Sequence, residues 1–211
     1  WNYNQISDIS DVTNDWEHFK LVCKPISETE TQYTLTQTKA DGTDGGTYKS
    51  LPAALNAAQD GDTVKLLANH TTNWSDVEAG EYSTLAVIKK TLTLDLNGKT
   101  VDYLEVGEVV PDEEGGILES TEGSLTIKDS GLGSVGTVSS LQLEKGKLTI
   151  EGGEIGTAAD TMSFVCSDEN GEVNIKGGLV WFFGCEGGTA NITGGKVYQL
   201  SVNPMGDDET V

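Results

Sequence analysis

A short phrase recurs along the second half of the chain and constrains the fold more than any other feature. Four copies join an apolar–polar–apolar triplet to a turn that contains glycine, and a looser copy precedes them. They occupy residues 92–98, 125–131, 148–153, 173–178 and 190–195. Units of roughly 20 residues with variable spacing are typical of strands and turns stacked one on another. The repeats therefore predict a parallel β-helix.

The repeats also predict which side chains form the core. Successive side chains of a strand point to opposite faces, so Leu148 and Ile150 should point inward and Thr149 outward. The Gly-Gly pair that ends most copies should form a tight corner, with a positive φ in one of the two glycines. After that corner three apolar residues fall at equivalent positions and should stack inside; they are Ile155, Val180 and Val197.

The N-terminal part differs from the repeats. Residues 1–40 contain no glycine and hold strand-like segments, which predicts a small β segment, either a hairpin or the tail of a preceding domain. After a glycine-rich break, Ser50 and Pro52 are typical of a helix start, and the Ala/Leu run that follows predicts a short helix at about residues 51–59. We expect this helix to cover the N-terminal end of a β-helix domain spanning residues 41–211.

The charge balance limits the partners. Thirty-four acidic residues face 13 basic ones, all lysine, and the net charge is −21. Such a chain is repelled by nucleic acid and by anionic membrane surfaces. No apolar stretch is long enough to span a membrane. The composition suits a soluble extracellular protein. The chain starts at Trp1 and reads as a fragment of a longer polypeptide with further domains.

Two of the three cysteines come shortly before repeat strands. Cys166 precedes the copy at 173 and Cys185 the copy at 190, so the two could be neighbours on adjacent coils. Strands about 4.8 Å apart allow a disulfide. Two buried free thiols are the alternative, and the sequence leaves both open. Cys23 would then be unpaired.

Aromatic residues supply the candidate binding site. Trp181 and Tyr198 follow Val180 and Val197 in the repeat register, so they should point outward on adjacent coils, with Phe183 close by. Two exposed aromatic rings one strand apart could receive a sugar ring or a protein side chain. A second candidate is Trp74, in what reads as a loop over residues 69–74. The alternative is an aromatic ladder covered by other parts of the protein.

The helix segment, the phrase Leu-Asp-Leu-Asn-Gly-Lys at residues 94–99 and the Gly-Gly repeats resemble secreted right-handed β-helix proteins of the pectate-lyase-like superfamily. They look most like cell-surface proteins of Gram-positive gut bacteria. The resemblance implies a right-handed helix and an adhesive or structural role at the cell surface, and some such proteins bind host immunoglobulin. We therefore expect a non-catalytic module that binds a host protein or glycan, with a structural stalk as the alternative.

Enzymatic activity is not expected. The lyases of the resembled superfamily use a basic residue, commonly arginine, and this chain has none; the hydrolases cluster aspartates, and no Asp pair falls on adjacent repeats. A polysaccharide-active enzyme is therefore the last alternative. No metal site is predicted, although Asp41, Asp44, Asp60, Asp62 and the acidic loop at 111–116 could supply ligands to a structural calcium ion.

Overall fold

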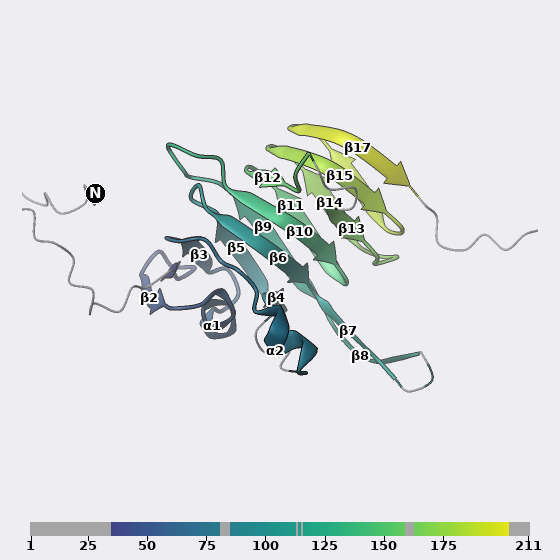
Figure 1. Cartoon of the computed structure of the whole chain (residues 1–211), viewed down its shortest axis with the longest axis horizontal. Helices are drawn as coiled ribbons and strands as arrows, with labels where there is room; N and C mark the ends of the chain where they lie inside the picture. Colours follow the sequence, from purple (N-terminus) through teal and green to yellow (C-terminus); the bar gives the residue numbers. More distant parts are fainter. Residues whose placement is uncertain (1–34, 81–84, 113, 115, 159–162, 203–211) are drawn as a thin grey trace, which may run out of the picture. The chain divides into compact units, whose positions relative to one another are not determined.

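The computed structural model describes residues 35–80, 85–112, 114, 116–158 and 163–202. The chain divides into two compact units, Trp1–Thr31 and Gln32–Val211. The first unit, and most of the predicted N-terminal β segment, lie outside the described residues. The second unit is mostly β (Figure 1).

The strands of the described residues form three sheets. The mixed sheet has eight strands, in the order β16 (Thr189–Ile192), β14 (Glu172–Ile175), β11 (Gly146–Ile150), β9 (Gly123–Lys128), β5 (Thr91–Asp95), β3 (Thr63–Leu66), β1 (Leu35–Thr38) and β2 (Asp44–Tyr48). The parallel sheet has seven, namely β4 (Val87–Ile88), β6 (Thr100–Val106), β10 (Thr137–Leu143), β12 (Glu154–Ile155), β13 (Phe164–Cys166), β15 (Leu179–Cys185) and β17 (Lys196–Val202). A separate hairpin pairs β7 (Glu108–Pro111) with β8 (Ile117–Thr121).

The prediction of a single right-handed β-helix was wrong. The repeat strands β5, β9, β11, β14 and β16 do pair in parallel, but β1 pairs antiparallel with both β2 and β3, which makes the eight-stranded sheet mixed. The acidic loop at 111–116 connects the antiparallel hairpin β7–β8, which forms its own sheet. Antiparallel neighbours can be joined by short turns, and short segments connect β1 to β2 and β7 to β8 in this way.

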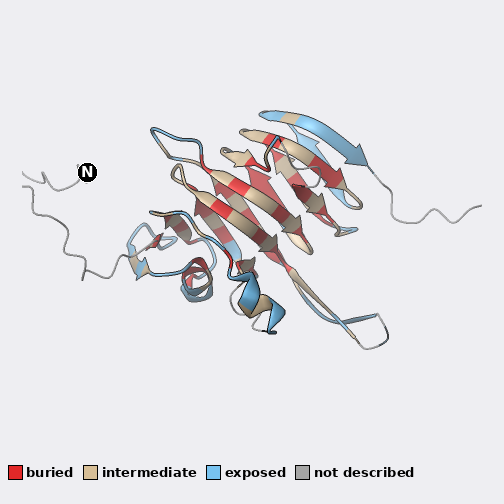
Figure 2. Cartoon of the chain, viewed as in Figure 1, coloured by how far each residue is buried: buried red, intermediate tan, exposed pale blue. Residues whose placement is uncertain are grey.

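The copies of the recurring phrase pair residue by residue. Leu125 lies opposite Leu92 on one side and Leu148 on the other, and the third position of the phrase stacks in the same way through Ile127, Ile150 and Ile175. These side chains are buried, and so are those of the parallel sheet at Ile155 and Val180. All of them belong to one core cluster, so the two sheets pack face to face (Figure 2).

The Gly-Gly corners adopt the predicted conformation. The second glycine of each pair has a positive φ, at Gly153, Gly178 and Gly195. At Gly177 and Gly194, the first glycine of the pair is needed for a different reason. A Cβ at Gly177 would lie 2.2 Å from the carbonyl oxygen of Glu151 on the neighbouring turn. Stacking of the turns therefore excludes side chains there.

Helix α1 (Leu51–Ala57) forms where the sequence predicted a helix. The Ser50 hydroxyl accepts a hydrogen bond from the N–H of Ala53, and Pro52 lies in the first turn, where its missing N–H has no cost. Leu51, Ala54 and Leu55 are buried in the core cluster. A second helix, α2 (Trp74–Glu78), begins in the segment predicted to be a loop.

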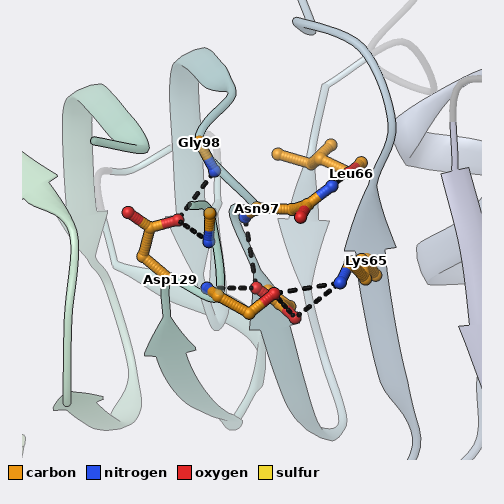
Figure 3. Close-up of polar contacts among 8 residues, drawn as sticks. Lys65, Leu66, Asn97, Gly98 and Asp129 are labelled. Atoms are coloured by element: carbon orange, nitrogen blue, oxygen red, sulfur yellow. Dashed lines mark hydrogen bonds and ion pairs between the residues drawn. The ribbon is translucent and has the colours of Figure 1, made fainter. Parts of the chain in front are cut away.

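Polar side chains fasten the turns that follow β5 and β9 (Figure 3). The Asp95 carboxylate accepts hydrogen bonds from the Asn97 and Ser130 N–H groups and from the Ser130 hydroxyl, and Lys65 lies 3.7 Å away. The Asp129 carboxylate accepts from the N–H groups of Gly98, Gly131 and Gly136, at 2.7, 3.1 and 2.7 Å. The Leu-Asp-Leu-Asn-Gly-Lys phrase at residues 94–99 thus contributes hydrogen bonds that stabilise the turns after β5 and β9.

Candidate binding site

The structure brings Trp181 and Tyr198 together. Trp181 is on β15 and Tyr198 on β17, and the strands pair in parallel with Val180 opposite Val197. The ring centroids lie 5.1 Å apart, with the ring planes at 44°. We call this pair the aromatic platform. Tyr198 is 66% exposed and Trp181 is half-buried.

Charged groups hold both rings of the platform. The indole N–H of Trp181 donates a hydrogen bond to the carboxylate of Glu154 on β12. The Lys196 ammonium lies 5.7 Å from the centroid of the Tyr198 ring, within range of a cation–π interaction. The platform therefore combines two aromatic surfaces with one fixed carboxylate and one ammonium group.

Phe183 is not part of this surface. Its side chain is fully buried and stacks on Phe164, with centroids 4.6 Å apart and planes at 9°. The reason is a departure from strict alternation in β15, where both Trp181 and Phe182 lie partly exposed between the buried Val180 and Phe183. The burial of Phe183 had a signal in the sequence, since Val180 and Phe183 are apolar residues at positions i and i+3. The pairs Val101–Leu104 and Val138–Leu141 have the same spacing and are also buried.

Trp74 lies elsewhere. It begins α2, is 46% exposed, and packs edge-to-face against Tyr103 on β6, with centroids 5.3 Å apart and planes at 71°. Strands β10 and β13 lie between β6 and β15 in the parallel sheet. Trp74 and the aromatic platform are therefore separate surfaces.

Next to Trp74 the structure reveals an acidic group that sequence reasoning missed. The Tyr103 hydroxyl donates to Glu105, and Glu144 follows the adjacent strand β10. Burial, and then the charge of Glu144, raise the pKa of Glu105 above its usual value. Burial likewise raises the pKa of Glu144, and Glu186 adds to the effect. Only the pairing of β6 with β10 brings Glu105 and Glu144 together, so no local sequence motif predicts that they are close.

The two cysteines predicted to be neighbours lie directly opposite each other. Cys166 on β13 pairs with Cys185 on β15, and both are free thiols. Both sulfur atoms approach the same carbonyl oxygen, that of Gly187, at 3.5 and 3.1 Å. Burial, together with the neighbouring Cys185, raises the pKa of the Cys166 thiol to about 11, which favours its protonated form at neutral pH.

The aspartates considered as calcium ligands hold turns instead. Asp62 is buried and accepts hydrogen bonds from the Gln37 side chain and from the N–H groups of Ala40 and Gln59. Asp41, Asp44, Asp60 and Asp112 each accept a hydrogen bond from a backbone N–H group, which for Asp60 is that of Thr91 at the start of β5. Within the described part of the chain, no three His, Cys, Asp or Glu side chains are arranged to hold a metal ion.

A polar hollow of roughly 660 Å³ lies where β9, β11 and β14 begin. Its lysines are largely engaged: Lys147 pairs with Glu172 at 2.9 Å, Lys89 with Glu108, and Lys90 donates to the carbonyls of Asn56 and Ala58. Lysine and acidic side chains line it in equal measure. The hollow presents neither an apolar surface nor a net charge, so we do not treat it as the binding site.

Comparison with known proteins identifies no relative: no family model, curated protein or solved structure matches the chain. Among the described residues, no helix is long and apolar enough to cross a membrane.

Proposed function

We propose that this chain is a non-catalytic binding module that recognises a glycan through the aromatic platform. The observation that carries the proposal is the contact between Trp181 and Tyr198, two rings 5.1 Å apart of which one is largely exposed. The module would belong to a larger bacterial protein at the cell surface, as the sequence resemblance implies.

The chemistry of the platform suits a sugar. One face of a pyranose ring carries C–H groups that pack on aromatic rings, while its rim carries hydroxyls that need hydrogen-bonding partners. Trp181 and Tyr198 offer the rings, Glu154 offers a carboxylate at the edge of the Trp181 indole, and Lys196 offers an ammonium group over the Tyr198 ring. The bond from the Trp181 indole to Glu154 fixes one ring before any ligand arrives, which lowers the entropic cost of binding.

A binding role fits the platform better than catalysis. Hydrolysis of a glycosidic bond needs two carboxyl groups about 5–10 Å apart on either side of the bond. The platform has a single carboxylate, Glu154, and that group accepts the indole N–H of Trp181. Glu105 and Glu144, whose side chains interact, lie near Trp74 and away from the strands of the platform.

The test is a glycan array followed by calorimetry, with mucins and immunoglobulins included. We expect Trp181→Ala and Tyr198→Ala each to weaken binding of a retained glycan by about tenfold or more, and Tyr198→Phe to preserve it. Trp74→Ala is the matched control, because it removes a partly exposed aromatic side chain from a separate surface. Circular dichroism of each variant verifies folding.

Three outcomes would overturn the proposal. Loss of binding in Trp74→Ala alone would move the site to α2. Retention of immunoglobulin but of no glycan would make the ligand a host protein. Failure to bind anything would favour the structural stalk.

A further inference from the structure

The apolar columns of the core stop at side chains that are exposed. Ile192 on β16 continues the column that contains Ile150 and Ile175, yet it is 46% exposed whereas they are buried. On β17, Leu200 continues the column of Phe164 and Phe183 and is 49% exposed, and Val202 is 66% exposed. Figure 2 shows this strand as the exposed end of the parallel sheet. We call β16 and β17 together the open end.

Within the described part of the chain, each strand of the open end is paired along one edge only. β16 is the last strand of the mixed sheet and pairs with β14; β17 pairs with β15 in the parallel sheet. Neither has a second neighbouring strand among the described residues. An edge with unpaired N–H and C=O groups is a template for another strand. Near the other end of the mixed sheet, by contrast, α1 buries Leu51, Ala54 and Leu55 in the core.

The charge of the open end differs from that of the whole chain. Residues 187–202 contain no acidic residue and one lysine, in a chain whose net charge is −21. Two copies of so acidic a protein repel each other least where they meet through a surface that lacks carboxylates, because like charges brought together oppose association. The open end is such a surface.

The geometry suits a symmetric contact. Since the two sheets pack face to face, a twofold axis normal to both would place β17 antiparallel to its symmetry mate and β16 antiparallel to its own mate at the same time. Antiparallel pairing satisfies the backbone groups of both edges, and a twofold interface uses the same patch on both subunits. We propose that two copies of this chain associate through the open end in this way, extending both sheets and burying Ile192, Leu200 and Val202.

Sedimentation velocity over a concentration series of the 211-residue chain tests the proposal. We expect a reversible dimer, and expect Ile192→Asp/Leu200→Asp to weaken it by tenfold or more. The control is Ile117→Asp/Leu118→Asp on β8, which adds the same charges at apolar side chains that are more exposed. Raising sodium chloride from about 0.05 to 0.5 M should strengthen the dimer, because screening reduces the repulsion between the copies.

Hydrogen exchange identifies the contact. Amides of residues 189–202 should become protected as concentration rises into the dimer range. A monomer at every concentration would overturn the proposal, and so would a dimer abolished by the β8 control. If the monomer showed protected 189–202 amides that removal of residues 203–211 exposed, the occupant of the open end would be the chain's own C-terminal segment.

Discussion

Single carboxylates hold the turns between the strands, and Asp129 is the clearest example. Its two oxygens accept hydrogen bonds from the N–H groups of Gly98, Gly131 and Gly136, which belong to two turns. Burial alone would raise the pKa of Asp129, but these three hydrogen bonds outweigh it and lower the pKa below the usual value. The ionised form is thus the one that the folded protein stabilises.

We therefore expect Asp129→Ala to destabilise the protein by about 1–3 kcal/mol, because three backbone donors lose a charged acceptor. Chemical denaturation at pH 7 measures the change. Asp41→Ala is the matched control: Asp41 also accepts two hydrogen bonds, but in an exposed turn, so its loss should have little effect. Equal losses in the two variants would contradict the role assigned to Asp129.

Between strands, the corners depend on glycine for two distinct reasons. Gly178 has φ +74°, a conformation that residues with a Cβ adopt at a cost, whereas Gly177 faces the carbonyl oxygen of Glu151 with room for no Cβ. The turns after β11 and β14 lie against each other. A larger side chain at Gly177 or Gly178 must therefore push these paired strands apart or bend them.

Alanine substitutions test this account of the corners. Gly177→Ala and Gly178→Ala should each reduce the free energy of unfolding by about 1–3 kcal/mol. Gly133→Ala should leave it nearly unchanged, because no atom lies within 4 Å of the position of a Cβ there. Urea unfolding followed by circular dichroism compares the three variants, and a large loss at Gly133 would show that packing at the corner is not the cause.

At the scale of elements, the sequence predicted the strands that belong to the repeats and the helix that has a local start signal. The apolar positions of β9, β11 and β14, the Gly-Gly corners and α1 followed from alternation, turn chemistry and a Ser-x-Pro helix start. The antiparallel pairing of β1 did not, because nothing local in Leu35–Thr38 specifies the direction of its neighbours.

The candidate site was predictable to the extent that it follows strand register. Trp181 and Tyr198 lie side by side because Val180 and Val197 before them pair, and the repeats gave that pairing. Phe183 was placed wrongly because β15 presents two consecutive residues outward, which breaks the period of two. Glu105 and Glu144 were missed because they come from different repeat units and share no motif.

For the whole molecule, the stability changes with pH in opposite directions for two groups of carboxylates. Glu105 and Glu144 have raised pKa values in the folded state, so the stability that they contribute is present below their unfolded pKa and is lost as pH rises through the folded value. Asp129 and Asp62 have lowered pKa values, so their contribution is present above the unfolded pKa and is lost as pH falls through the folded value. The net charge of −21 adds repulsion that weakens on acidification.

We expect the melting temperature to rise as pH falls from 7, reach a maximum between about pH 4 and 6, and then fall. Glu105→Gln should raise the melting temperature at pH 7 and flatten the rise, since Gln can still accept the Tyr103 hydroxyl. Glu119→Gln, at an exposed position of β8, is the control. Thermal melts at half-unit pH steps measure both; a maximum at or above neutral pH would contradict the expected balance.

The in-register columns also bear on how such a protein can change over generations. Leu125, Leu148 and Val173 occupy the same place in the successive strands β9, β11 and β14 of the mixed sheet, and each of these strands meets the next through the same kinds of contact. A gene segment that encodes one such strand with its turn can be duplicated or deleted with little change to these apolar contacts, because the new neighbours match the old ones. The differences in length between successive repeats fall in loops, where insertions are tolerated, and in the β7–β8 hairpin between β5 and β9. The number of repeat strands is therefore a quantity that mutation can alter in whole steps, while the chemistry of a surface such as that of Trp181 and Tyr198 changes independently, one residue at a time.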